Sequence, residues 1–548
     1  MTMRRFALLA GGSLLGLLSL FLAWNRVYQV DEAQSVTMAR IIATHETASF
    51  FTSTPLHLLV LAPLAVVSNR SADLFHAFRL VALALFWANL FLLVKATGAR
   101  LRSREGLATF AFAATLAPLW RYGLEFRHDN VQLFGVLLIW ILMRPRDEAA
   151  PGAYFWIGLI AAGLQLSLFK AFAFWVPLSL AALAFPHRAF RRPRLLLLAQ
   201  WSAGAATALG LHRLLRAAWR IEEPVLQVFS ASLEVARTTA RFSPWPTLER
   251  LPDETPLLVV AALGALGLAV GLFDRTGWGD ERRRTSYETA ALLAGSIGIL
   301  FLNPTPFPYN LLLVVPPAVI ASSAALREKL LGLGESRRHR ALFAALVAVQ
   351  LVPFGIRVKS LLEAGNGRQQ ELMGLAERLT DPKRDRVFDL AGLVPTRRGI
   401  SYTWFVNLTN FRWFQKDPAL AENPAAVVIP NYRVGYLSKE QQEFLKKNYR
   451  ALASDFLVLG AELPPGGGTW LCRHPGRYAL GAEGSHASFH VDGAPLEAGV
   501  FAFAAGPHHV EAEGGSAPFL FWVGPPSPQP VRIGPGDLNR LFPVPGDF

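Results

Sequence analysis

The run FALLAGGSLLGLLSLFLAW at residues 6–24, followed by NRVYQVDEAQ at 25–34, decides the fold class of this chain. The first part carries no charge and is about as long as a bilayer-crossing helix, which needs about 20 apolar residues. Arg4 and Arg5 before it are also compatible with a signal peptide, but no small-residue cleavage site follows, so we expect an uncleaved helix. The second part places Asp31 and Glu32 just beyond the end of that helix.

Further apolar runs of this kind fill the first 357 residues. Of the whole chain, 52% is hydrophobic and only 17% is charged, whereas soluble domains are roughly a quarter charged. We therefore expect a polytopic α-helical membrane protein with about 11 transmembrane helices. The predicted spans are 6–24, 76–95, 107–120, 131–143, 153–169, 171–185, 195–211, 256–273, 287–302, 309–325 and 341–356.

The positive charge is confined to this hydrophobic part. From Lys359 onward the chain has 19 Lys or Arg and 19 Asp or Glu, so the whole net charge of +14 precedes it. Basic residues gather in alternate loops, such as 98–106 and 274–286, as expected for cytoplasmic loops. The charge thus indicates membrane topology, not nucleic-acid binding, and it predicts a non-cytoplasmic tail. A single cysteine, Cys472, excludes an intramolecular disulfide framework.

The tail changes character along its length. Residues 358–462 alternate helical segments with short strands such as AVVIP at 426–430, which predicts an α/β subdomain. Residues 463–548 contain short alternating strands with turn signals, which predicts a β-sandwich-like module. We therefore expect a transmembrane domain at 1–357 and two extracytoplasmic parts behind it. Regularly spaced aromatic residues of the β-rich module are expected to form its core, although they are also compatible with a sugar platform.

Ionisable and polar residues gather at the predicted outer ends of the spans. Each has a purely structural reading as well, such as a helix start, a polar turn, a snorkelling lysine or an interfacial tyrosine. Together, however, they place acids and cations at one face of one bundle. Cations there can hold a phosphate, and an acid can take a proton from an alcohol. The candidates are Asp31, Glu32, Arg79, Glu125, Arg127, His128, Asp129, Lys170, Arg213, Tyr309 and Asn310.

The order of these features resembles GT-C glycosyltransferases, in particular protein O-mannosyltransferases and the lipid A aminoarabinose transferase. Asp31-Glu32-Ala33 and Ser53-Thr54-Pro55-Leu56-His57 resemble the family's first outer loop. Further similarities follow in order: Phe78-Arg79-Leu80, Arg127-His128-Asp129 for the family's Arg-Pro-Asp, Phe169-Lys170 for its Thr-Lys, and Pro308-Tyr309 with Val315-Pro316-Pro317 for its Arg-Tyr-Leu-Leu-Pro. The chain departs from aminoarabinose transferases at 51–55, where Phe-Thr-Ser-Thr-Pro replaces Phe-Glu-Lys-Pro-Pro. This departure argues against an aminoarabinose donor.

The resemblance implies an integral membrane glycosyltransferase of the cell envelope, in the bacterial inner membrane. It would take a sugar from a polyprenyl-phosphate donor, at the non-cytoplasmic face, and pass it to a hydroxyl on a protein, lipid or glycan. Asp31 would be the base, and Arg127 and Lys170, with Arg79 or Arg213, would stabilise the leaving phosphate. A second carboxylate would be Glu32 or Glu46. No cofactor is required, although Asp31, Glu32 and Asp129 are residue types that bind a hard cation.

Two alternatives come from other classes of protein. A transporter or flippase of a lipid-linked substrate also uses intramembrane charges, but between repeated halves at mid-bilayer, and the sequence shows no repeat. A non-enzymatic envelope protein would bind sugars through its β-rich tail alone.

Overall fold

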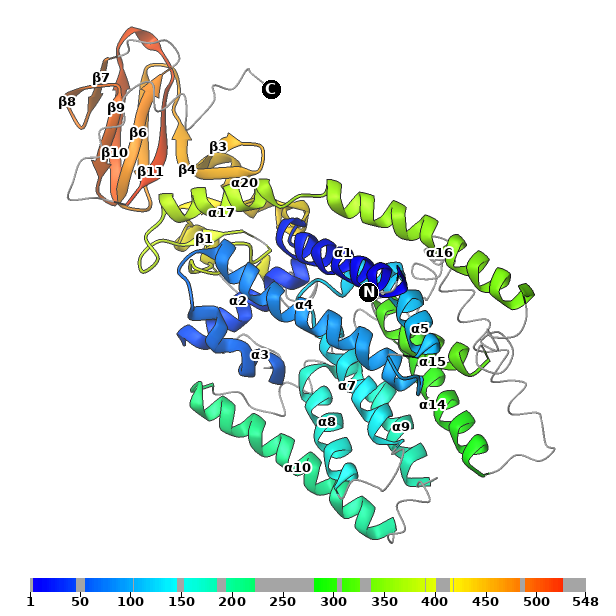
Figure 1. Cartoon of the computed structure of the whole chain (residues 1–548). Coiled ribbons are helices and arrows are strands. Elements are labelled where there is room, and N and C mark those ends of the chain that lie inside the picture. The colour runs from blue at the N-terminus through cyan, green and yellow to red at the C-terminus, as the bar shows by residue number, and fades with distance from the viewer. Residues whose placement is uncertain are drawn as a thin grey trace. The chain divides into compact units, whose positions relative to one another are not determined.

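The computed structural model (Figure 1) describes residues 3–45, 55–101, 103–144, 152–184, 194–221, 280–302, 308–325, 337–389, 391–400, 414–416, 418–482 and 488–525. The chain folds as two compact units. The first contains Met1–Val67 and Leu74–Asn366, and the second contains Ser68–Asp73 and Gly367–Phe548. The predicted three-part division stays a prediction.

The first unit is helical. Each of the ten predicted spans that lie within the described residues contains a helix, whereas 256–273 lies outside them. The number of membrane crossings stays a prediction. The helices are α1 (Met3–Asn25), α2 (Val30–Thr44), α3 (Leu56–Leu61), α4 (Ser71–Ala96), α5 (Arg104–Ala114), α6 (Ala117–Tyr122), α7 (His128–Leu142), α8 (Ala153–Ser167), α9 (Phe172–Ala184), α10 (Arg194–Ala218), α14 (Asp280–Leu302), α15 (Leu311–Ala325) and α16 (Arg337–Glu363), with short 3₁₀ turns at Ala62–Val66, Phe169–Ala171 and Pro308–Asn310.

One predicted span, 107–120, is two helices instead of one. Helix α5 ends at Ala114, and α6 begins at Ala117 after Leu116 has taken an extended conformation. Pro118 explains the break, because a proline fits the first turn of a helix but removes a backbone hydrogen bond from a helix interior. The short α6 then leads directly to the turn at 123–127, which carries part of the predicted site.

Helix α10 of the first unit exposes large apolar side chains. Of the described helices, α4 and α10 are long and apolar enough to cross a bilayer unaided. On α10, Leu195 and Leu214 are 80% and 70% exposed. Exposed leucines on a long helix, with charged side chains buried inside the bundle, are the reverse of a water-soluble arrangement and fit a lipid surround.

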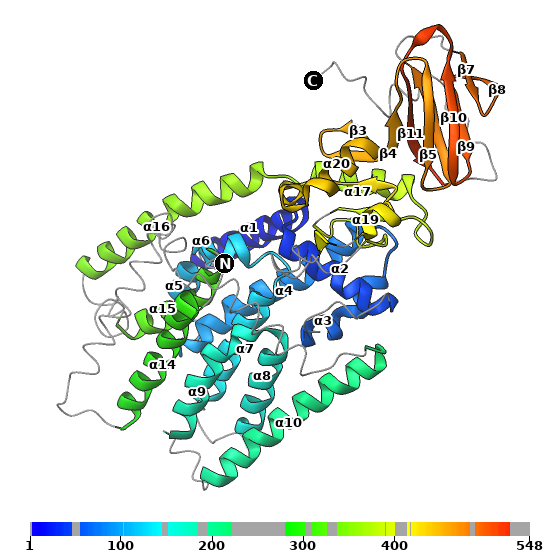
Figure 2. The same ribbon diagram turned by 180° about the vertical axis from the view of Figure 1, so that it is seen from behind.

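Small residues let the helices of this bundle approach closely. A Cβ atom at Gly158 of α8 would lie 2.0 Å from the carbonyl oxygen of Trp201, and one at Gly204 of α10 would lie 1.9 Å from that of Phe155. Figure 2 shows α10 lying along α8. Gly135 plays the same part between α7 and α8, where a Cβ would meet the side chain of Leu164 at 2.6 Å. Contacts of this kind are typical of membrane helices, because lipid offers no hydrophobic drive for their association.

The second unit combines helices with two sheets. Its seven-stranded sheet has the order β1-β2-β4-β11-β6-β9, with β3 also paired to β4, and its four-stranded sheet has the order β5-β10-β7-β8. Strand β4 joins β2 and β3 to β11, so one continuous sheet crosses the predicted boundary at residue 463. The elements are α17 (Gly367–Leu379), β1 (Val387–Phe388), α19 (Ala419–Glu422), β2 (Val427–Val428), α20 (Lys439–Asn448), β3 (Tyr449–Ala453), β4 (Phe456–Glu462), β5 (Gly467–Cys472), β6 (Gly476–Ala482), β7 (Ser488–Val491), β8 (Ala494–Glu497), β9 (Gly499–Phe503), β10 (Gly506–Ala512) and β11 (Pro518–Gly524).

The aromatic residues of the β-rich part form a core, as the sequence predicts. Trp470 packs edge-on against Tyr478 and Phe503, with ring centroids 4.8 and 5.4 Å apart, and Trp522 packs against Tyr478 at 5.4 Å. All four side chains are buried. They are therefore unavailable as a sugar-binding platform.

A buried carboxylate ties the α/β part of this unit to the β-rich part. Asp385 accepts hydrogen bonds from the backbone N–H of Asp381 at 2.7 Å and from Arg384 at 3.1 Å, and it lies 2.8 Å from Nε2 of His474. Burial alone would raise the pKa of Asp385, but the hydrogen bonds from His474 and Asp381 outweigh it, so the pKa lies below its ordinary value.

Candidate active site

Asp31 and Glu32 lie in the first turn of α2, and the helix sends their side chains in different directions. Glu32 is fully buried, and both its oxygens accept hydrogen bonds from Arg79 of α4 at 2.8 Å. The same guanidinium donates to the carbonyl oxygens of Arg26 at 2.6 Å and Val27 at 2.9 Å. This bidentate pair thus holds the connection between α1 and α2 against α4.

Arg127 is the centre of the site. It precedes α7 and is buried, and its Nη2 lies 2.8 Å from Oδ2 of Asp31 and 3.3 Å from Oδ2 of Asp129. Its Nη1 lies 3.4 Å from Oε2 of Glu125. Its guanidinium carbon also lies 3.9 Å from the centre of the Tyr309 ring. The predicted turn between the third and fourth spans therefore folds around one guanidinium.

Lys170 reaches the same group from the turn between α8 and α9. Its Nζ lies 2.5 Å from Oδ1 of Asp129 and donates to Oδ1 of Asn310 at 2.9 Å. It also lies 4.9 Å from the centre of the Tyr309 ring. Nε2 of His128 lies 3.5 Å from Oδ2 of Asp129 on the other side. Asp129 is thus held by three residues that the sequence analysis named.

Some of the site was missed at the sequence level. Arg26 is buried and forms an ion pair with Glu125, and it donates to the carbonyl oxygen of Arg121 at 2.7 Å. Its position directly after the first span gave no signal, because basic residues are common at span ends. Asn310, in contrast, was among the candidates as a polar residue at the start of a span, and it is fully buried and binds Lys170.

The charges of this network balance. Asp31, Glu32, Glu125 and Asp129 face Arg26, Arg79, Arg127 and Lys170, and each acid lies within 4 Å of at least one of these cations. The side chain of Asp31 is 38% exposed, whereas Glu32, Glu125 and Asp129 are at most 2% exposed. Asp31 is therefore the most exposed carboxylate of this network.

Other predicted residues are placed elsewhere. Arg213 is exposed on α10, and no hydrogen bond or ion pair joins it to the network within the described ranges. Glu46 lies outside the described residues. Glu32 and Asp129 bind different cations, and the described part of the chain brings no three His, Cys, Asp or Glu side chains together as a metal site.

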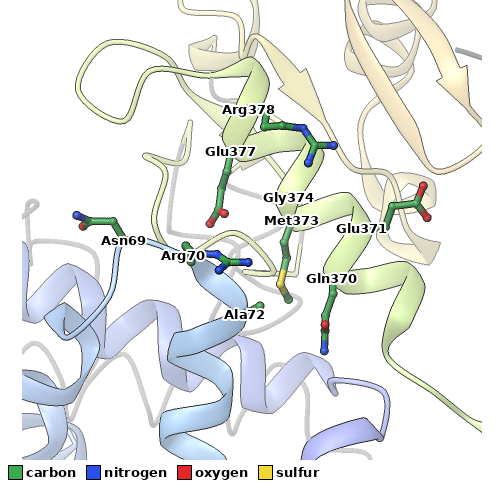
Figure 3. Close-up of a pocket in the computed structure, with 9 residues that line it drawn as sticks. All are labelled: Asn69, Arg70, Ala72, Gln370, Glu371, Met373, Gly374, Glu377 and Arg378. Atoms are coloured by element: carbon green, nitrogen blue, oxygen red, sulfur yellow. The ribbon is translucent and has the colours of Figure 1, made fainter. Parts of the chain in front are cut away.

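The second unit has a pocket of its own, of about 550 Å³, between residues 69–72 and one face of α17 (Figure 3). Oε1 of Glu377, which lines it, accepts hydrogen bonds from the backbone N–H of Ser71 at 2.6 Å and from the hydroxyl of Thr396 at 2.7 Å. This acid therefore has a structural task, and none of the predicted site residues lines the pocket. The candidate site is the charged network of the first unit.

Comparison with solved structures shows the fold type. The chain is similar to ArnT from Cupriavidus metallidurans bound to undecaprenyl phosphate, with a TM-score of 0.55 and 14% identity over 84% of this chain and 98% of that one. The apo structure of the same ArnT gives a TM-score of 0.54 and 13% identity, over 83% and 98% of the two chains. No family model and no curated protein matches the chain. The chain thus has the fold of ArnT, and the resemblance inferred from the sequence is confirmed at the level of the fold.

Proposed function

We propose that the chain is an inner-membrane glycosyltransferase that moves a sugar from a polyprenyl-phosphate donor to a hydroxyl acceptor at the non-cytoplasmic face. The observation that carries this proposal is the Asp31–Arg127 pair: an accessible carboxylate 2.8 Å from a buried guanidinium, with Lys170 close by. A base for the acceptor and cations for the phosphate are the two requirements of this reaction. The GT-C fold and the undecaprenyl phosphate bound by ArnT support the choice of donor.

In the proposed reaction the acceptor oxygen attacks the anomeric carbon of the donor sugar. The acceptor proton passes to Asp31, and the bond between the anomeric carbon and the phosphate oxygen breaks, with its electron pair staying on the phosphate. The leaving lipid phosphate gains one negative charge. Arg127 and Lys170 stabilise that charge, and because α7 and the Asn310 contact already hold them in place, little reorganisation is needed during the reaction.

The buried pair of Glu32 and Arg79 has a positioning role in this proposal. Glu32 also accepts a hydrogen bond at 3.4 Å from the backbone N–H of Phe126, next to Arg127. The pair thus fixes both α2, which carries Asp31, and the turn that carries Arg127. Glu32 has no exposed surface and no free oxygen for a substrate.

The proposal is tested with the purified chain in lipid nanodiscs. Undecaprenyl phosphate carrying a radiolabelled sugar is added together with an envelope extract, and label in the glycolipid and glycoprotein fractions is measured. We expect label transfer that depends on the chain. Mass spectrometry of envelope glycolipids and glycoproteins from cells with and without the protein then identifies the acceptor. No transfer from any lipid-phosphate sugar, and identical envelopes in both cells, would refute the proposal.

A further inference from the structure

Several buried polar groups of the first unit have no hydrogen-bond partner among the described residues. Gln132 is 1% exposed, and neither its amide oxygen nor its amide nitrogen has a hydrogen-bond partner among the described residues. Elsewhere in the first unit, Nδ2 of the fully buried Asn310 and Nδ1 of the buried His57 are also without a partner among the described residues. An unsatisfied buried polar group costs about 1–3 kcal/mol, so each of these groups requires an explanation.

Each of these groups is linked to the charged network through a neighbouring residue or a shared helix face. Gln132 follows Asp129 by three residues and His128 by four on α7, so it lies on the same face of that helix. Asn310 binds Lys170, which in turn binds Asp129. The ring centroid of His57 of α3 lies 6.3 Å from that of Phe126, the residue before Arg127. Burial, with a smaller contribution from His128, lowers the pKa of His57 to about 3. All three side chains are therefore neutral at physiological pH.

Helix packing brings α3 to this side of the bundle. A Cβ at Gly163 of α8 would lie 3.6 Å from the side chain of Leu56, the residue before His57. The next residue of α8, Leu164, packs against Gly135 of α7, one turn beyond Gln132. Helix α8 thus lies against both the helix that carries His57 and the face that carries Gln132.

We infer that Gln132, Asn310 and His57 form a subsite for the hydroxyl groups of the donor sugar, an inference that rests on the proposed function. A sugar hydroxyl both donates and accepts hydrogen bonds, and the unpartnered atoms include an amide oxygen that accepts and two amide nitrogens that donate. Because these groups are neutral, they complement the uncharged ring and leave the phosphate to Arg127 and Lys170. A donor lacking a matching hydroxyl would leave them unpaired, which makes such a subsite selective.

The test compares the affinity of the full chain for undecaprenyl phosphate with its affinity for undecaprenyl phosphate carrying glucose, mannose or arabinose. We expect at least one sugar to tighten binding. In Gln132→Leu the increase in affinity that the sugar provides should be about two- to tenfold smaller than in the wild type, because one neutral hydrogen bond is lost. The affinity of this variant for undecaprenyl phosphate alone should be unchanged. His57→Phe should likewise reduce the increase in affinity that the sugar provides. Gln132→Leu should also raise the Tm of the ligand-free protein, because it removes an unsatisfied amide from the interior.

Gln350→Leu is the matched control. Gln350 is an equally buried glutamine of α16, and its Oε1 is likewise without a partner among the described residues. Its Nε2, unlike that of Gln132, donates to the carbonyl oxygen of Phe112 at 2.7 Å and to the hydroxyl of Thr115 at 2.6 Å. Replacing Gln350 should lower the Tm and leave unchanged the increase in affinity that the sugar provides. The inference would be overturned if the sugar increased the affinity of both Gln132→Leu and His57→Phe as much as that of the wild type, and ordered water would then be the partner of these groups. It would also be overturned if no sugar increased the affinity of the wild type. A wild type that does not bind undecaprenyl phosphate at all would refute the proposed function itself.

Discussion

Replacing Asp31 by asparagine tests the proposed base while leaving the fold and the phosphate-binding cations in place. Asparagine keeps the shape of the side chain but cannot accept a proton, and a positioned base contributes about 10²- to 10⁴-fold to such a step. This range corresponds to roughly 3–5 kcal/mol of activation free energy. Asp31 is 38% exposed, and Arg127 keeps Asp129 and Glu125 as partners, so the stability lost should be no more than about 1 kcal/mol.

The assay measures sugar transfer by Asp31→Asn, donor binding and Tm on the same preparation. We expect transfer to fall at least a hundredfold while Tm changes by only a few degrees and the donor still binds. Asp73→Asn is the control, because Asp73 is also an exposed acid in the first turn of a helix, where it accepts a hydrogen bond from Ser68. Transfer above a tenth of the wild-type rate in Asp31→Asn would show that another group is the base.

The remaining predictions concern the phosphate, the buried pair, the topology and the C-terminal unit. Lys170→Gln should weaken donor binding about ten- to hundredfold, since a charge-assisted hydrogen bond contributes about 1.5–3 kcal/mol; equal Kd values for variant and wild type would contradict this. Glu32→Gln should lower the free energy of unfolding by about 3–5 kcal/mol, because it leaves Arg79 buried without its counter-charge; an unchanged Tm would refute the positioning role. Cysteines introduced at 98–106 should be labelled from the cytoplasm and those in 358–548 from outside, and the reverse pattern would overturn the orientation. Asp385→Asn should destabilise the second unit by about 2 kcal/mol at pH 7; because the pKa of folded Asp385 is lowered, this difference should shrink as the pH falls below about 4, and a difference independent of pH would contradict it.

The positions of the helices could be predicted from the sequence because a helix leaves a local pattern of apolar residues. Apolar runs of bilayer length and basic loops can be recognised without knowing which helices pack against one another. Helices α7 and α8 lie where such runs predict them. The break between α5 and α6 was missed because the predicted span ignored Pro118, although its effect on a helix is also local. The sheet of the second unit was harder still. That β4 pairs with β11, some sixty residues later, depends on long-range packing that no local pattern encodes.

The candidate site could be predicted as a set of residues but not as a network of pairs. Arg127, Asp129 and Lys170 were named from their positions at span ends, and the structure joins them. Arg26 carried no signal, because an arginine after a first span is expected to contact headgroups and only the fold turns it towards Glu125. Gln132 was missed for the opposite reason: a single glutamine in an apolar run is noticed only when its amide is seen to be buried without a partner.

The two adjacent acids on α2 have different roles, one structural and one proposed to be chemical. Neighbouring residues of a helix point about 100° apart, so Asp31 and Glu32 cannot face the same way. One is exposed beside Arg127, and the other is enclosed by Arg79. In lipid a buried charge without a partner is costly, so a site that must hold cations for a phosphate also needs acids to hold those cations in place while the site is empty. Glu32, Glu125 and Asp129 can meet that need because they are buried, and in the proposed reaction this leaves the exposed Asp31 to act on the acceptor.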